Sequence, residues 1–116
     1  MEKQKLEKIG LSPNEAKCYL TLLKIGSASA NEISRKSGIH RVSVYDALRG
    51  LHEKGLISQI TKTNKLLFEV ANPIKLLNII NEKEEILQES RKIIPKLLQE
   101  FKTIKSKQEI HSFKGI

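Results

Sequence analysis

The sequence predicts a mainly α-helical fold with one small β-hairpin, a winged helix-turn-helix followed by a long C-terminal dimerisation helix. Three observations predict it. Residues 29–55 contain two helical segments separated by a glycine turn, and residues 56–70 contain two strand-like runs around a polar segment. Residues 79–104 carry apolar side chains that recur every seven residues. Helix, turn, helix and two-stranded ribbon, in that order, are typical of a winged helix-turn-helix.

The N-terminal part of the chain contains repeated helix start and stop signals. A first helix is expected to begin near Glu2. Residues 12–15 (SPNE) combine a serine cap, a proline at the first helical position and a glutamate that completes a capping box. Gly26 is expected to end the helix that follows. Residues 29–32 (SANE) repeat the capping box, and Gly38 follows six residues later, so the next helix is short.

A third helix is predicted from about residue 40 to residue 54, and Gly55 closes it. Its inward face is expected to carry four apolar residues, Val44, Ala47, Leu48 and Leu51. Residues 56–60 and 66–70 are rich in branched side chains and are predicted as strands. The polar, basic segment 61–65 joins them as a hairpin, although it lacks the Asn-Gly pair of the tightest turns.

From Asn72 and Pro73 onward a long helix is predicted to about residue 107. Its seven-residue repeat is typical of a coiled-coil seam. The candidate dimerisation residues are Ile79, Ile80, Ile86, Leu87, Ile93, Ile94, Leu97, Phe101 and Ile104. Lys83 and Ser90 interrupt the seam, and Pro95 is expected to bend the helix or to break it after Ile94. Alternatively, the apolar stripe folds back on its own domain.

These elements divide the chain into three regions. Residues 1–72 form a winged helix-turn-helix domain, residues 73–108 form the dimerisation helix, and residues 109–116 form a short tail. The tail, from Ile110 onward, resembles the first strand of a further domain.

Charge favours a polyanionic partner. The 116 residues include 21 Lys and Arg against 13 Asp and Glu, with a net charge of +8 and a pI of about 9.7. An excess of this kind suits nucleic acid. Aromatic residues make up 4% of the chain and tryptophan is absent, so the core is expected to be aliphatic.

Other classes of function find no support. The three histidines lie far apart in the sequence, and neither a phosphate loop nor a serine nucleophile motif occurs, so we expect no enzyme, cofactor or metal. Cys18 is the single cysteine and is expected to be a small packing residue. No apolar run approaches the length of a membrane helix, and the charged N-terminus is no secretory signal. A soluble cytoplasmic chain without membrane contact is therefore expected.

Candidate DNA-binding residues lie at the start of the third helix and around it. A helix N-terminus favours anions, and the Arg41 guanidinium can make paired hydrogen bonds to guanine. The candidates are Ser29, Asn31, His40, Arg41, Val42, Ser43, Arg49, Lys62, Thr63, Asn64 and Lys65. Simpler roles remain open: Ser29 as a helix cap, Arg41 as a solvated side chain or a partner of Asp46, and the tip lysines as protection of a hairpin edge.

Residues 6–72 resemble the N-terminal domain of the archaeal TrmB-like transcription regulators. The segments that carry the resemblance are LSPNEAKCY at 11–19, GIHRVSVYDAL at 38–48 and LHEKGLI at 51–57. The resemblance implies a winged helix whose third helix reads an operator and whose following helix builds a dimer. It places Arg41, Ser43 and Tyr45 at the DNA, with Lys62 and Lys65 in the wing.

The chain departs from the family at two points. His40 stands where the family often has proline, and it is expected simply to start the helix. Larger members continue into a domain that binds sugars or other effectors. The chain is either a small stand-alone regulator or a piece of a longer protein, and a small-molecule effector is not expected for the short chain as given.

The sequence therefore predicts a homodimeric, sequence-specific regulator that binds double-stranded DNA. The alternatives are a winged helix that serves as a protein interaction module and a nonspecific chromatin-coating protein.

Overall fold

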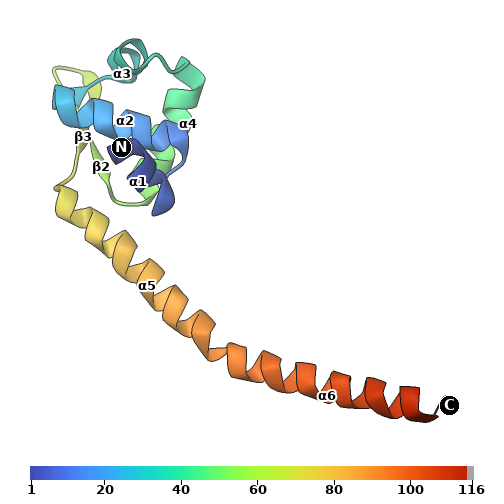
Figure 1. The fold of residues 1–116 in the computed structure, drawn as a ribbon. Coiled ribbons are helices and arrows are strands. Elements are labelled where there is room, and N and C mark those ends of the chain that lie inside the picture. Colours follow the sequence, from blue (N-terminus) through green and yellow to red (C-terminus); the bar gives the residue numbers. More distant parts are fainter. Residues whose placement is uncertain (115–116) are drawn as a thin grey trace. The chain divides into compact units, whose positions relative to one another are not determined.

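The computed structural model describes the backbone of residues 1–114 and the side chains of residues 1–108. Contacts divide the chain into a winged unit, Met1–Ile80, and a helical unit that begins at Asn81. The elements are, in order, α1 (Glu2–Lys8), α2 (Pro13–Ile25), β1 (Ser27–Ala28), α3 (Ala30–Ser37), α4 (Arg41–Glu53), β2 (Ile57–Lys62), β3 (Lys65–Val70), the short 3-10 helix η1 (Pro73–Lys75), α5 (Leu76–Lys92) and α6 (Ile94–Lys114) (Figure 1). The predicted fold class is confirmed.

Both predicted capping boxes are present. The N–H of Glu15 donates to Ser12 Oγ at 3.1 Å, and the N–H of Ser12 donates to Glu15 Oε1 at 2.8 Å. Ser29 and Glu32 repeat this arrangement at the start of α3, at 3.2 and 3.4 Å. Each box satisfies backbone donors that a helix start otherwise leaves open.

The wing differs from the predicted hairpin in two respects. The sheet has three strands in the order β1-β3-β2, all antiparallel, because Ser27 and Ala28 pair with Glu69 and Phe68. The β2–β3 turn is also tighter than the expected five-residue loop. Lys62 pairs with Lys65, so only Thr63 and Asn64 form the turn, with φ of 53° and 61°. Two positive φ values indicate a type I′ turn, which matches the twist of the strands without the Asn-Gly pair.

The core of the winged unit is mainly aliphatic, as predicted. Its largest fully buried side chains are Tyr19, Leu22, Ile33, Leu51, Leu56, Val44 and Cys18. These residues come from α2, α3, α4 and the segment leading into β2, so the helices and the sheet share one core. Cys18 is a packing residue, and burial raises the pKa of its thiol to about 11.

A partly buried ion pair joins the start of α2 to the end of α4. Lys54 Nζ lies 3.0 Å from Glu15 Oε2, and Glu15 is 7% exposed. A Cβ atom on Gly50 of α4 would collide with the Glu15 carboxylate. The absent side chain therefore makes room for this ion pair.

The long helix is interrupted, as the proline predicts. α5 ends at Lys92 and α6 begins at Ile94, so the break lies at Ile93, just before the expected position after Ile94. Pro95 has no N–H to donate to the carbonyl of Arg91, which removes one helical hydrogen bond at this point. The strand expected from Ile110 is wrong over the residues described, because α6 continues to Lys114. Gly115 and Ile116 lie outside the described residues.

None of the helices in the described part of the chain combines the length and apolar character needed to span a bilayer.

Candidate nucleic-acid interface

Side-chain hydrogen bonds define the turn between α3 and α4. Gly38 adopts the left-handed conformation, with φ of 76°, and its N–H donates to the Ser34 carbonyl at 2.9 Å. Ser34 Oγ donates to the Ile39 carbonyl at 2.6 Å, and the Ile39 N–H donates to Ser37 Oγ at 3.2 Å. Ile39 itself is 9% exposed and belongs to the core cluster. The two serines therefore hold the backbone that leads into α4, a role not predicted from the sequence.

His40 begins α4, as expected. The N–H of Val42 donates to His40 Nδ1 at 3.4 Å, so the imidazole caps the helix. The first turn of α4 carries no acidic residue. Because no carboxylate offsets the positive end of the helix dipole, this end favours an anionic partner.

The two faces of α4 have separate roles. The four predicted inward residues, Val44, Ala47, Leu48 and Leu51, are all buried. The opposite face carries the predicted DNA contacts: Arg41, Val42, Tyr45 and Arg49 are exposed, and Ser43 is half-buried. Val42 is 64% exposed although it is apolar. This face of α4 is therefore not packed against the core of the winged unit.

Arg41 and Asp46 have different partners. The Arg41 guanidinium lies over the Tyr45 ring, 5.9 Å from its centroid. Asp46 instead pairs with Arg49, at 3.4 Å between Oδ1 and Nη1. The alternative in which Asp46 pairs with Arg41 is therefore not what the structure shows. A cation over an aromatic face is attracted by the ring quadrupole, so Tyr45 supports Arg41 on the exposed surface.

The hairpin carries the remaining basic residues. Lys62, Thr63, Asn64 and Lys65 are all exposed at its tip. One groove is shared by α4 and the hairpin, and its lining includes Tyr45, Arg49, Gln59 and Leu66. In the view of Figure 1, the start of α4 and the hairpin tip both lie at the upper edge of the winged unit. Sequence reasoning missed Gln59 and Leu66, because strand alternation alone does not indicate which residues border α4.

The start of α3 contributes less open surface. Ser29 is half-buried, and its Oγ accepts the Glu32 N–H within the capping box. Asn31, two residues further on, is exposed. The hydroxyl group of Ser29 is thus used as a helix cap in the folded chain, while the side chain of Asn31 is open to solvent.

The candidate dimerisation residues are mostly uncovered. Ile86, Leu87, Ile93, Ile94, Leu97, Phe101 and Ile104 are between 50% and 63% exposed. Ile79 is partly buried against the core of the winged unit, and Ile80 is half-buried. Leu98, 49% exposed, extends the stripe but was not predicted, although it follows Ile94 by one helical turn. The open stripe therefore begins at Ile86.

The fold and the exposed α4 define a winged-helix protein. Residues 6–74 match the family model described as the sugar-specific transcriptional regulator TrmB. The chain belongs to this family, and the resemblance predicted from its sequence is confirmed. The family consists of transcription regulators and not of enzymes, which confirms that prediction as well.

Individual relatives agree with the family. The chain is 40% identical over 79 residues to the HTH-type sugar sensing transcriptional regulator TrmBL1 of Pyrococcus furiosus, covering 68% of this chain and 23% of that protein. The solved structure of TrmBL2, described as an archaeal chromatin protein, matches with a TM-score of 0.73 at 22% identity, over 86% of this chain and 40% of that one. The ST1889 protein from the archaeon Sulfolobus tokodaii matches with a TM-score of 0.56 at 19% identity, over 75% and 99%.

The two structural matches show the fold. The chain spans about a quarter of the length of TrmBL1, 23%.

Proposed function

We propose that the chain is a cytoplasmic transcription regulator that binds double-stranded DNA in a sequence-specific manner and acts as a homodimer. The observation that carries the proposal is the exposed leading end of α4, which presents Arg41 without a carboxylate in the first helical turn. Membership of a family of transcription regulators supports the same conclusion.

Arg41 is the proposed base-reading residue. Its guanidinium can donate two parallel hydrogen bonds to O6 and N7 of guanine in the major groove. The Tyr45 ring beneath it restricts the side chain before DNA arrives, which lowers the entropy lost on binding. Val42, exposed beside Arg41, offers an apolar contact to a thymine methyl group.

The hairpin tip is proposed to hold the sugar-phosphate backbone. Lys62 and Lys65 are exposed directly on either side of the two-residue turn. Ammonium groups on a short wing suit phosphate contacts, which position the protein without reading sequence. Arg49, which forms an ion pair with Asp46, is proposed as a second contact to the DNA backbone, made from α4.

The homodimer is proposed from the apolar stripe of α5 and α6. Side chains such as Leu87, Ile94 and Phe101 expose more than half of their surface. An exposed apolar stripe of this length marks an association surface. Pairing two chains would present two copies of α4 to successive major grooves, about 34 Å apart on a palindromic site.

The proposal is tested by selecting bound duplexes from random DNA and then measuring variants on the selected site and on a scrambled duplex. Arg41→Ala is expected to lose about 1–3 kcal/mol on the selected site and little on the scrambled one. Lys62→Ala is expected to weaken both equally and to lower the salt dependence by about one phosphate contact. Lys8→Ala, an exposed lysine of α1, is the matched control and should change neither.

Equal losses on both duplexes for Arg41→Ala would refute the base-reading role. Binding without any selected sequence would favour a nonspecific coating protein. Absence of DNA binding at moderate salt would favour the interaction module.

A further inference from the structure

The helical unit carries opposite charge in its two halves. Residues 81–90 contain four glutamates, Glu82, Glu84, Glu85 and Glu89, against one lysine, Lys83. Residues 91–108 contain six basic residues, Arg91, Lys92, Lys96, Lys102, Lys105 and Lys107, against one glutamate, Glu100. All these side chains are exposed. The sign changes between Glu89 and Arg91, in the last turn of α5 and just before the break at Ile93.

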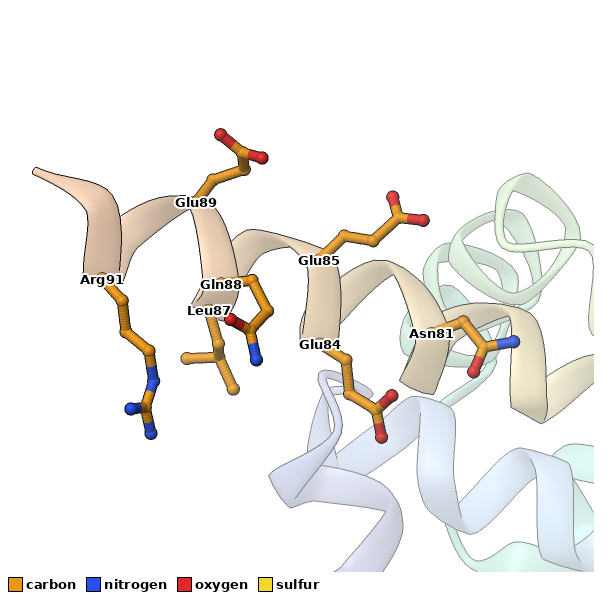
Figure 2. Close-up of a pocket in the computed structure, with 7 residues that line it drawn as sticks. All are labelled: Asn81, Glu84, Glu85, Leu87, Gln88, Glu89 and Arg91. Atoms are coloured by element: carbon orange, nitrogen blue, oxygen red, sulfur yellow. The ribbon is translucent and has the colours of Figure 1, made fainter.

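The chain's own contacts do not account for the acidic half. Figure 2 shows Glu85 and Glu89 projecting to the same side of α5. Like charges four residues apart destabilise an isolated helix. Between residues 81 and 108, the ion pair that forms is Glu89 with Lys92, at 3.1 Å, and both side chains are 72% exposed. An ion pair so largely exposed contributes little to stability.

Two copies of this helix can pair in two directions. A parallel pair would place the acidic half beside the acidic half and the basic half beside the basic half. An antiparallel pair places the glutamates of one chain beside the lysines of the other. Charges beside the seam determine orientation in coiled coils, because like charges that face each other are unfavourable.

We infer that two copies of this chain pair antiparallel along residues 81–108, with the acidic half of each helix against the basic half of the other. The inference rests on the homodimer proposed above and adds its orientation. The centre of the pairing lies near Ile93, close to the change of sign between Glu89 and Arg91.

The position of the helix break agrees with this arrangement. Ile93 and Ile94 are 52% and 57% exposed at the centre of the stripe. In an antiparallel pair the two breaks meet, so α5 of each chain lies along α6 of the other. The apolar residues then continue on both sides of the centre, with Leu87 on the α5 side and Leu97 on the α6 side.

A distance between two identical labels tests the direction. A spin label at Ser106→Cys, in the full chain with Cys18→Ala, is expected about 40 Å from its copy in an antiparallel pair, from 1.5 Å of rise per residue. In a parallel pair the two labels would lie about 10 Å apart, the spacing of packed helices. Ser90→Cys lies near the centre and is the matched control, with a short distance, about 15 Å or less, in either direction.

The outcomes separate the orientation from the homodimer itself. A long distance at position 106 with a short one at position 90 supports the antiparallel pair. Short distances at both positions would overturn the orientation but leave the homodimer. A monomer in sedimentation equilibrium, with no distance between chains, would overturn both.

A second experiment distinguishes the two directions by whether neutralising two glutamates weakens or strengthens association. Glu82→Gln with Glu85→Gln is expected to weaken association about fivefold, because it removes attraction to the partner's lysines. A parallel pair would instead associate more tightly, since the change removes repulsion. Glu2→Gln with Glu53→Gln changes the net charge equally on exposed residues of the winged unit and is expected to leave association unchanged.

Discussion

Gly50→Ala gives a direct test of the partly buried ion pair between Glu15 and Lys54 in the winged unit. In most helix interiors this substitution is stabilising, by up to about 1 kcal/mol, because glycine has the greater conformational freedom when unfolded. Here the new Cβ would collide with the Glu15 carboxylate. The carboxylate must move. This movement breaks the hydrogen bonds that it accepts from Lys54 Nζ, at 3.0 and 3.1 Å, and from the Ser12 N–H, at 2.8 Å.

The size of the effect follows from these bonds. Loss of the Ser12 capping contact costs about 1 kcal/mol. Lys54 is one-third exposed, so its ion pair contributes only about 1 kcal/mol after solvent screening. A displaced carboxylate that stays buried without its donors adds about 1 kcal/mol or more. After the gain in helix propensity of up to about 1 kcal/mol, Gly50→Ala is expected to destabilise the winged unit by about 2 kcal/mol.

Thermal unfolding followed by circular dichroism measures this change. For a domain of this size, 1 kcal/mol corresponds to about 4–8 °C in Tm. The control is the same substitution in a Glu15→Ala background, where the collision is absent and Gly50→Ala should become stabilising. Protein concentration is held constant, because association shifts Tm. If Gly50→Ala is as stable as the parent, or still destabilises without Glu15, the reasoning is refuted.

Three other outcomes are expected. Thr63→Asn with Asn64→Gly supplies the residues that a type I′ turn prefers and should raise Tm by a few degrees, whereas an unchanged or lower Tm would contradict the assigned turn. Tyr45→Phe should keep the preference for the operator and Tyr45→Ala should reduce it, because the aromatic ring, and not the hydroxyl group, supports Arg41. If the two substitutions change the preference equally in competition binding, the ring does not support Arg41. Burial raises the pKa of the Cys18 thiol from 9.0 to about 11. The free energy of unfolding should therefore fall between pH 9 and 11, because the thiol ionises first in the unfolded chain. In urea titrations at each pH, Cys18→Ala should lack this pH-dependent loss of stability.

The sequence by itself determined the features that depend on neighbouring residues. Ser12 and Glu15 form a capping box because three residues along the chain bring side chain and backbone together. Gly38 ends α3 because glycine adopts a positive φ at low cost. Pro95 interrupts the long helix wherever the fold places it, since the missing N–H is a local property. The inward face of α4 followed from helical periodicity in the same way.

Only the tertiary structure decided the contacts between distant residues. Glu15 and Lys54 are 39 positions apart, and nothing periodic in the sequence links them or indicates why Gly50 lacks a side chain. The two-residue strand β1 is too short to leave an alternating pattern, and it exists because β3 offers it a partner. Local patterns predict helices and turns, whereas side-chain partners depend on which surfaces the packed core brings together.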